Sequence, residues 1–362
     1  MDQSDDWNNF PNEWLIIVLL VLLVYVIVVI IILPLVHLCN PPPKQQQQTS
    51  TMEEDGGVPV NEDLENSSTQ NGRWTNSEAI GWSAAVIVLC ILFGITILCI
   101  IAFLVLRTVE QKYLFVPHVT SAYRKIHGNW IGLRSGGGLL HCTPHANPSN
   151  RPLLFLHGNT GNLDLYEAAL KRCGQMGYNI YALEYAGYGI ATNNKDRKNP
   201  DCKSVIQDVL EAWDVCGDSE CIVMGFSLGG AILGKIYDHL KPMPAQLVFL
   251  NTFHSIAGLI QSKYQIIGPM LTPLLKTQWS TQPPKYYHNE VLVVYTKDDD
   301  VVTPEQGKEL CKIFETLSPV CVELPDGGHR YSTIRHLDQW ANSTYLLPPF
   351  TEETMAAHIS SG

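Results

Sequence analysis

The chain has 362 residues, which is enough for one large or two ordinary folded domains with additional segments. Charged residues make up only 16% of it, against about 25% in a typical soluble protein. The formal net charge is −11, and no basic stripe interleaved with aromatic residues occurs. This composition argues against nucleic acid as a partner.

Two long apolar runs account for the shortage of charge. No Asp, Glu, Lys or Arg occurs from Trp14 to Cys39, and again none occurs from Ala79 to Leu106. A helix needs about 20 apolar residues to cross the bilayer core, and both runs reach that length. Buried core helices are the alternative, but such elements are shorter and carry some polar residues. We therefore predict transmembrane helices over residues 15–38 and 80–106, with the lipid bilayer as a partner.

A cleaved signal peptide is a second alternative for the first run. The segment before it holds four acidic residues and no Lys or Arg, whereas a signal peptide begins with a basic region. The run is also longer than the apolar region of a signal peptide. We therefore expect a two-pass membrane protein.

Basic residues near the ends of the two runs predict the orientation in the membrane. None precedes the first run, two lie between the runs, and four follow the second run from Arg107 to Lys125. Because Lys and Arg favour the cytosolic side, this bias places the C-terminal part in the cytosol and the intervening segment in a lumen or outside. The glycosylation sequon at Asn66 agrees with this orientation, whereas the sequon at Asn342 favours a lumenal C-terminal part.

The ten cysteines are spread along the chain. They lack the CxxC spacing of zinc sites and the density of disulfide-rich domains. We therefore expect no metal site and no disulfide framework. Cys39, at the end of the first run, could be acylated; an ordinary thiol at the membrane edge is the alternative.

Composition divides the chain into segments. After the first run come PPPKQQQQTST and then acidic stretches rich in Ser and Asn. Such a segment cannot bury enough apolar surface to offset the entropy of ordering it, so we predict a disordered linker. The predicted order is an acidic tail (1–14), a first transmembrane helix (15–38), the linker (39–79), a second transmembrane helix (80–106), a folded domain (107–346) and a C-terminal tail (347–362).

Short apolar runs alternate with helical patterns in the folded domain. Strands are predicted at Trp130–Leu133 and Leu139–Thr143, as a hairpin across SGGG, and then at Leu153–Leu156, Asn179–Leu183, Cys221–Met224, Leu247–Leu250, Val291–Tyr295 and Val320–Leu324. Helices are predicted at Leu163–Met176, Lys203–Val215, Leu228–His239 and Pro304–Thr316. This alternation indicates an α/β fold with a mostly parallel sheet, helices on both faces and the hairpin at an antiparallel edge.

The sequence GFSLG places Ser227 between Gly225 and Gly229, after a predicted strand and before a predicted helix. The Gly-x-Ser-x-Gly pattern is weak by itself. In a strand–turn–helix setting, however, the glycines permit the crowded turn that presents a nucleophilic serine, and the helix N-terminus adds partial positive charge. An ordinary serine in a tight turn is the alternative, because a nucleophile needs a base and an acid from elsewhere.

Two later strand ends supply an acid and a base in the order that such a site requires. The acids Asp298, Asp299 and Asp300 follow one predicted strand, and His329 follows another within a glycine-rich loop. A solvated turn and a surface histidine are the alternatives for each feature alone. Because the carboxyl ends of parallel strands meet at one edge of a sheet, the coincidence predicts a Ser–His–Asp triad.

The loop HGNTGN, after the strand at Leu153–Leu156, predicts an oxyanion hole. Backbone N–H groups of the loop, best those of Asn159 or Thr160, would act together with the N–H of Leu228 on a tetrahedral intermediate. His157 precedes the serine in chain order, so we interpret it as shaping the loop and not as the base. A phosphate-binding loop is the alternative, but the Gly-Lys-Ser/Thr ending is missing.

Six motifs together resemble the α/β-hydrolase superfamily, most closely its membrane-anchored α/β-hydrolase-domain serine hydrolases: HGNTGN, EYAGYG, GFSLGG, NTFHSI, DDDVVTPEQG and PDGGH. The resemblance extends from about Tyr113 to Leu346 and implies an α/β-hydrolase fold with Ser227, Asp299 and His329 as the triad.

The family pattern also bears on which aspartate is the acid. In that pattern a glycine stands three residues before the acid and a valine two residues after it. Val301 fits Asp299 as the acid, whereas Thr296 replaces the glycine. Asn251 stands where some families carry an acid, and an amide cannot take that role.

These expectations imply a membrane-bound serine hydrolase that cleaves an ester, thioester or amide through an acyl-enzyme. An acyl-lipid or acylated-protein substrate is expected, with no cofactor, and protein partners are left open. The segment 252–287, rich in Ile, Leu, Pro and Trp, would be a cap over an apolar pocket; surface helices covering the sheet edge are the alternative. The rival interpretation is a catalytically silent scaffold or lipid-binding receptor with the same fold.

Overall fold

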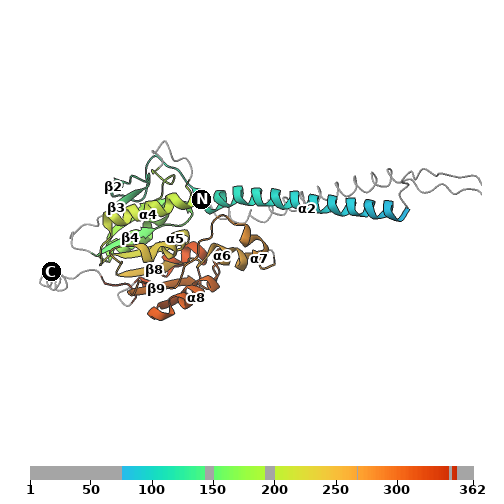
Figure 1. Cartoon of the computed structure of the whole chain (residues 1–362). Helices are drawn as coiled ribbons and strands as arrows, with labels where there is room; N and C mark the ends of the chain where they lie inside the picture. Colours follow the sequence, from blue (N-terminus) through green and yellow to red (C-terminus); the bar gives the residue numbers. More distant parts are fainter. Residues whose placement is uncertain (1–75, 143–150, 192–199, 267, 342–344, 349–362) are drawn as a thin grey trace, which may run out of the picture. The chain divides into compact units, whose positions relative to one another are not determined.

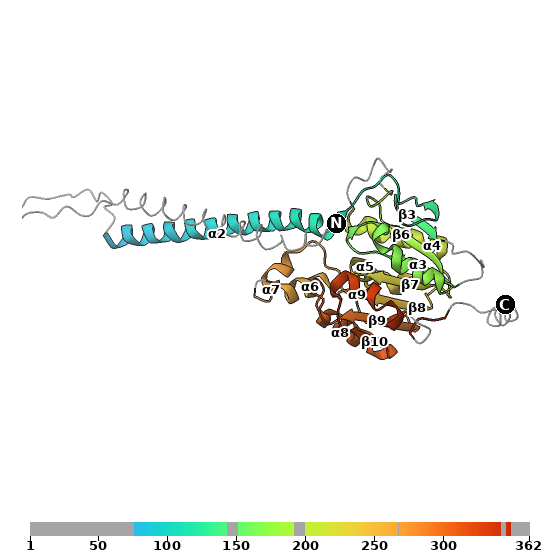
Figure 2. The same ribbon diagram turned by 180° about the vertical axis from the view of Figure 1, so that it is seen from behind.

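The computed structural model describes residues 76–142, 151–191, 200–266, 268–341 and 345–348 (Figures 1 and 2). The chain forms two compact units, residues 1–105 and 106–362. The predicted first transmembrane helix (15–38), almost all of the predicted linker and both sequons lie outside the described residues. The two-pass topology therefore stays a prediction.

Helix α2 (Asn76–Leu114) contains the second predicted membrane span. Its stretch Val86–Val105 has a mean hydropathy of 3.2, and no part of it is buried. Among the described residues this is the one helix that is long and apolar enough to cross a membrane. Exposed side chains such as Leu89 and Phe93 distinguish it from the core helix of a soluble domain.

Residues 106–362 contain an eight-stranded sheet with the spatial order β10-β9-β8-β7-β4-β6-β3-β2. Its strands are β2 (Asn129–Gly132), β3 (Gly138–Cys142), β4 (Pro152–Leu156), β6 (Asn179–Glu184), β7 (Ile222–Phe226), β8 (Gln246–Leu250), β9 (Glu290–Thr296) and β10 (Val320–Leu324). β2 pairs antiparallel with β3, β3 pairs antiparallel with β6, and the other pairs are parallel. The mostly parallel sheet and its antiparallel hairpin edge are confirmed.

Helices cover both faces of this sheet. They are α3 (Glu167–Gln175), α4 (Cys202–Cys216), α5 (Leu228–Ile236), α8 (Pro304–Ile313), α9 (Gly328–Arg335) and α10 (Leu337–Trp340). Figure 1 views the sheet from the side of α4 and α5, and Figure 2 views it from the side of α3 and α9.

Strand β8 shows why the central strands read as continuous apolar runs. Val248 and Leu250 belong to the core cluster that also contains side chains of α3 and α10. Phe249 points to the opposite face, where its ring lies 5.3 Å from the ring of Phe314, directly after α8. Because both faces are covered, successive residues of a central strand are all buried and the usual alternation with polar residues is lost.

Local sequence signals define the ends of α4. The carboxylate of Asp201 accepts the backbone N–H groups of Lys203 and Ser204 at 2.9 and 2.8 Å, which satisfies donors that have no partner inside the helix. In the reciprocal hydrogen bond of this capping box, the hydroxyl of Ser204 accepts the backbone N–H of Asp201 at 2.9 Å. Gly217 follows the last helical residue.

Several elements differ from the sequence-based expectation. Two short strands, β1 (Val116–Pro117) and β5 (Thr160–Gly161), pair in parallel and were not expected. A two-residue strand carries no periodicity, so only the fold reveals it. The helix expected at Leu163–Met176 begins as the 3₁₀-helix η1 (Leu163–Tyr166) before α3, and α5 is followed by the short 3₁₀-helix η2 (Tyr237–His239).

The segment 252–287 forms a helical insert between β8 and β9. It contains α6 (Ile256–Lys263), α7 (Gly268–Leu271) and the 3₁₀-helix η3 (Thr272–Leu274). The carboxylate of Glu110 accepts the backbone N–H groups of Lys276 and Thr277, each at 2.6 Å, so the insert is tied to residues that precede the sheet. The insert has the place and composition of the predicted cap, and its role as a cap stays a prediction.

The described C-terminal residues 345–348 are hydrogen-bonded to residues at or directly before the starts of three central strands. Four hydrogen bonds join them: Gln246 Nε2 to Tyr345 O (2.7 Å), Leu347 N to Gln246 Oε1 (3.1 Å), Tyr178 Oη to Leu347 O (2.8 Å) and Arg151 Nε to Pro348 O (2.8 Å). Arg151, Tyr178 and Gln246 stand at the starts of β4, β6 and β8, so this segment closes the amino-terminal edge of the sheet.

One disulfide joins Cys311 of α8 to Cys321 of β10, with their Cα atoms 6.4 Å apart. The sequence predicted no disulfide framework, and it gave no indication of this single pair. A single bridge has no spacing signature in sequence, because its two cysteines meet only when α8 packs beside β10.

Removal of this disulfide is expected to lower stability. The two cysteines are 10 positions apart in the sequence, and for a closed loop of that length the loop-entropy relation gives a contribution of about 2–3 kcal/mol. For a domain of this size the melting temperature of Cys321→Ser would fall by about 5–10 °C. Thermal unfolding of the full chain in non-ionic detergent measures the change.

The matched controls are Cys311→Ser and the double variant. All three should lose the same stability, because each removes the same bond. The wild type has ten cysteines, so eight free thiols are expected in the denatured, unreduced protein. Ten free thiols in the wild type, together with equal melting temperatures for wild type and variants, would contradict the assignment.

Candidate active site

Ser227 stands in a sharp turn between β7 and α5. Its backbone has φ 51° and ψ −117°, a conformation that a residue with a side chain adopts at a cost of order 1–3 kcal/mol. The surrounding backbone holds it there: Ser227 N donates to Leu250 O at 2.9 Å, and Thr252 Oγ1 donates to Ser227 O at 2.5 Å. Such a turn presents the serine hydroxyl at the carboxyl edge of the sheet.

The two flanking glycines are required by close approach of the backbone. A Cβ atom on Gly225 would lie 2.5 Å from the Cα of Gly230. A Cβ atom on Gly229 would overlap the carbonyl oxygen of Leu156 at the end of β4. Helix α5 therefore starts so close to β7 and β4 that no side chain fits at either position.

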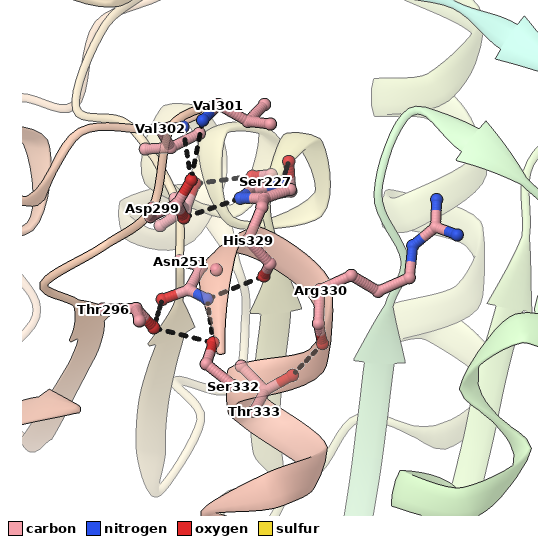
Figure 3. Close-up of polar contacts among 12 residues, drawn as sticks. Ser227, Asn251, Thr296, Asp299, Val301, Val302, His329, Arg330, Ser332 and Thr333 are labelled. Atoms are coloured by element: carbon pink, nitrogen blue, oxygen red, sulfur yellow. Dashed lines mark hydrogen bonds and ion pairs between the residues drawn. The ribbon is translucent and has the colours of Figure 1, made fainter. Parts of the chain in front are cut away.

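The structure brings the three predicted triad side chains together (Figure 3). His329 Nε2 lies 2.9 Å from Ser227 Oγ, and His329 Nδ1 lies 2.7 Å from Asp299 Oδ2. A carboxylate facing Nδ1 accepts a proton from it, which leaves the lone pair of Nε2 facing the serine hydroxyl. This arrangement can withdraw the proton of Ser227 while the oxygen attacks a carbonyl carbon.

Asp299 is held in place through its second carboxylate oxygen. Oδ1 accepts the backbone N–H groups of Val301 and Val302 at 2.9 and 2.8 Å (Figure 3). The side chain of Asp299 is only 1% exposed, so water does not compete for it. In the family pattern, Val301 was the reason for choosing Asp299 as the acid. The backbone N–H of Val301 contacts the carboxylate of Asp299 directly.

The three consecutive aspartates have different surroundings. Asp298 accepts the backbone N–H groups of Gly327 and Gly328 at 3.2 and 2.9 Å, directly before His329. Asp300 is exposed. Only Asp299 of the three is buried and faces His329, so the geometry agrees with Asp299 as the acid of the triad.

His329 lies on a helix and not in the loop that its glycine-rich neighbours suggested. It is the second residue of α9, and Gly327 and Gly328 before it have φ 108° and 61°. Positive φ values are favourable for glycine, so these two residues form the tight turn that starts the helix. The ring of Phe226 lies 5.1 Å from that of His329 and supports it from the side of β7.

A buried polar network that the sequence did not reveal fixes the start of α9. Asn251 Nδ2 donates to the carbonyl oxygen of His329 and to Ser332 Oγ, both at 2.8 Å. Thr296 Oγ1 donates to Asn251 Oδ1 at 3.0 Å and lies 2.7 Å from Ser332 Oγ (Figure 3). Thr296 has only one hydroxyl hydrogen, which it gives to Asn251. The contact between the two hydroxyl groups is therefore a hydrogen bond that Ser332 donates to Thr296, and it completes a closed set of three hydrogen bonds among the three side chains.

This network explains two departures from the family pattern. Thr296, in place of glycine, supplies a hydroxyl, and Asn251, in place of an acid, supplies an amide donor for His329 O. Thr296 and Asn251 are each 1% exposed, and Ser332 is 0% exposed. A buried network whose polar groups are all hydrogen-bonded makes its surroundings rigid. A side-chain pattern spread over three elements gave no signal in the sequence.

The predicted oxyanion loop lies beside the serine turn, because β4 pairs with β7. A Cβ atom on Gly158 would lie 3.2 Å from the ring of Phe226, the residue before Ser227. Asn159 O accepts the N–H of Val116 at 3.0 Å and the hydroxyl of Tyr188 at 2.7 Å, so the loop is anchored. The N–H of Leu228 stands at the start of α5, where backbone donors have no acceptor within the helix. The roles of Asn159, Thr160 and Leu228 in an oxyanion hole stay predictions.

His157 does not face the serine. It is buried, with Nδ1 2.7 Å from Gly158 O and Nε2 2.9 Å from Glu184 Oε1. Glu184 Oε2 also accepts the Tyr123 hydroxyl at 2.6 Å; burial and this neighbouring carboxylate raise the pKa of Tyr123 well above its usual value. These contacts join the loop after β4 to the end of β6, in agreement with His157 as a residue that shapes the loop.

In the part of the chain that the structure describes, no group of three or more His, Cys, Asp or Glu residues is placed to hold a metal ion. Ser227, His329 and Asp299 are placed as a serine triad would be.

Comparison with known proteins gives matches over the folded domain. A family model described as "Serine aminopeptidase, S33" (Hydrolase_4) matches residues 147–305. Protein bem46 of Schizosaccharomyces pombe is 26% identical over 166 residues, which cover 44% of this chain and 55% of that protein. The Arabidopsis thaliana "Alpha/beta hydrolase domain-containing protein WAV2" is 26% identical over 209 residues, which cover 52% of this chain and 64% of that protein.

These matches span between about half and two thirds of the length of the two relatives. Among solved structures, mouse alpha/beta hydrolase domain-containing protein 10 is 13% identical with a TM-score of 0.45, and covers 60% of this chain and 98% of its own. A Pyrococcus furiosus esterase is 14% identical with a TM-score of 0.47, and covers 64% of this chain and 94% of its own. The family match and the two relatives show that the folded domain is similar to proteins of the α/β-hydrolase superfamily.

Proposed function

We propose that the protein is a membrane-bound serine hydrolase that cleaves an ester, thioester or amide bond. The observation that carries the proposal is the continuous chain of short contacts from Ser227 Oγ through His329 to Asp299, at 2.9 and 2.7 Å. The strained turn at Ser227 supports it, because such strain persists where the surrounding structure holds a functional group in place.

The proposed reaction is acyl transfer in two halves. Ser227 Oγ attacks the carbonyl carbon while His329 Nε2 takes the hydroxyl proton, and Asp299 stabilises the imidazolium through Nδ1. His329 then gives the proton to the leaving group, and an acyl-enzyme remains on Ser227. Water, deprotonated by His329, cleaves the acyl-enzyme and restores the serine. Backbone N–H groups of Leu228 and of Asn159 or Thr160 would stabilise the oxyanion in both halves.

An acyl-lipid or acylated-protein substrate fits the rest of the chain. Helix α2 carries a candidate membrane span, and the helical insert after β8 is rich in apolar residues. A tethered enzyme of this kind meets substrates that reside in the membrane. No cofactor takes part in the proposed mechanism.

A catalytically silent scaffold or receptor is the second candidate. A binding protein has no need for an imidazole bonded on one side to a serine hydroxyl and on the other to a buried carboxylate. Labelling of the protein with a fluorophosphonate, which reacts with an activated serine, separates the two candidates.

Ser227→Ala is expected to abolish both fluorophosphonate labelling and hydrolysis of a short p-nitrophenyl ester. Loss of a triad member lowers turnover by about 10⁴- to 10⁶-fold. The melting temperature of the full chain in detergent should stay close to that of the wild type, because the hydroxyl contributes little to packing. Equal labelling of the two proteins would contradict the assignment of the nucleophile.

The three aspartates provide a matched series for the acid. Asp299→Asn should lower turnover by about 10³- to 10⁴-fold, because the amide favours the wrong tautomer of His329. Asp298→Asn loses one acceptor for the turn before His329 and should cost less than about tenfold. Asp300→Asn, at an exposed position, serves as the control and should keep full activity. Steady-state kinetics of the three variants test the order; a larger loss in Asp298→Asn would move the acid by one residue.

We propose further that the hydrolase domain faces an oxidising compartment, such as a lumen, and not the cytosol. The disulfide between Cys311 and Cys321 supports this orientation, because such bonds persist in oxidising compartments. The sequon at Asn342 agrees with it. The bias of Lys and Arg around the apolar runs favours the cytosol instead, but the bias is modest.

Glycosidase digestion of the full chain from cells tests the orientation. The wild type should shift in size, and Asn342→Gln should lose that shift while Asn66→Gln keeps it. A shift lost only in Asn66→Gln would place the hydrolase domain in the cytosol and restore the orientation that the charge bias predicts.

A further inference from the structure

Arg330 follows His329 in the first turn of α9, but its side chain takes a different direction. Figure 3 shows it extending away from Asp299, toward the ribbon on the other side of the site. Its backbone carbonyl accepts the hydroxyl of Thr333 at 3.1 Å, which fixes the main chain from which the side chain extends. The residue is half-buried.

The Arg330 side chain lines an apolar cavity between the sheet and helices α3 and α9. The cavity wall includes Leu165, Tyr166, Phe226 and Ile334, and Arg330 is the one charged residue among the described lining residues. A guanidinium beside apolar surface keeps less of its hydration than one in open solvent, which strengthens its attraction for an anion.

Two walls of this cavity are shared with the candidate active site. Phe226 directly precedes Ser227, and its ring lies 5.1 Å from that of His329. The hydroxyl of Tyr166 accepts the N–H of Gly158 at 3.1 Å, in the loop predicted to hold the oxyanion. A group bound at Arg330 would therefore lie against side chains that themselves contact His329 and the loop after β4.

The charge of Arg330 is not balanced within the described residues. Three other arginines pair with carboxylates: Arg151 with Glu220 (2.8 Å), Arg172 with Asp338 (2.6 Å) and Arg335 with Asp326 (2.8 Å). Arg330 has no ion pair of this kind in the described part of the chain, although the whole protein has a net charge of −11. An anion from outside the protein would supply the missing partner.

The nearby Tyr166 hydroxyl agrees with this picture of the local charge. Burial raises the pKa of Tyr166 to about 12, and the positive charge of Arg330 acts in the opposite direction. Tyr166 therefore stays a neutral group beside the guanidinium and does not compete for it as an anion.

We propose that Arg330 binds an anionic group of the substrate, a carboxylate or a phosphate. The guanidinium matches both groups because its parallel N–H donors can engage two oxygens at once. The proposal rests on the proposed hydrolase function and narrows its substrate class to esters, thioesters or amides that carry negative charge.

Two pairs of matched substrates test the proposal with the full chain in non-ionic detergent. The carboxylate pair is p-nitrophenyl hydrogen glutarate and the uncharged p-nitrophenyl valerate, which have acyl groups of similar length. The phosphate pair is an acylglycerol phosphate and the monoacylglycerol with the same acyl chain. The pair that shows the larger charge preference identifies the anion.

Arg330→Gln should lower kcat/KM by about 10- to 100-fold for the anionic member of that pair and by less than about threefold for the neutral member. The loss should appear mainly in KM. Arg330→Lys should recover part of the preference, because the charge is kept while the paired donors are lost. Arg335→Gln, on the same helix but bonded to Asp326 at the surface, is the control and should change neither substrate.

Equal losses on charged and neutral substrates in Arg330→Gln would overturn the proposal in favour of a structural role, and unchanged kinetics would overturn it as well. Failure of the hydrolase function itself looks different, because neither pair would be cleaved and Ser227 would not react with fluorophosphonate. In that case the binding of dodecyl phosphate, measured as a rise in melting temperature, tests Arg330 alone. The melting temperature of the wild type should rise and that of Arg330→Gln should not. Equal rises in the two proteins would contradict anion binding at Arg330.

Discussion

The backbone conformation of Ser227 is the constraint on which the rest of the site depends. A φ of 51° at a residue with a side chain is unfavourable, and two contacts from neighbouring strand ends, Leu250 O and Thr252 Oγ1, hold it in place. The turn also requires α5 to start against β4, which excludes side chains at Gly225 and Gly229. The parallel order β4-β7-β8 thus fixes where the serine can stand, and the other two residues of the predicted triad must come to it.

His329 is held near the serine by contacts from residues that have no part in the proposed reaction. Asp298 holds the turn before the histidine through Gly327 and Gly328, and the buried amide of Asn251 holds its carbonyl oxygen. The imidazole is therefore positioned from both sides along the chain, independently of its contact with Asp299. Such support keeps the ring in place when its charge changes during a reaction.

Sequence reasoning predicted the elements whose signal is local. The central strands are apolar runs because both faces are buried, and Ser227, Asp299 and His329 follow three of them in the order of a serine triad. The choice of Asp299 among three aspartates depended on Val301, whose N–H does contact its carboxylate.

Features that arise only when distant segments meet could not be predicted in this way. Asn251 and Ser332 are 81 residues apart in sequence, and no pattern links an asparagine after one strand to a serine on a later helix. The Cys311–Cys321 bond is of the same kind. The glycines of PDGGH favoured a loop, whereas they form the turn that begins α9. A loop and a turn that starts a helix both use the freedom of glycine at positive φ, and the packing of the rest of the domain decides which of the two forms.

The closure of the sheet by residues 345–348 has a consequence for folding during synthesis. These residues bond to Arg151, Tyr178 and Gln246, which precede them by 99 to 197 positions. Contacts at such separation form late, because the chain between them must first be ordered. While a ribosome is still translating the last residues, β4, β6 and β8 therefore have an open amino-terminal edge, and a nascent chain that stalls there would expose the backbone and apolar surface on which aggregation begins.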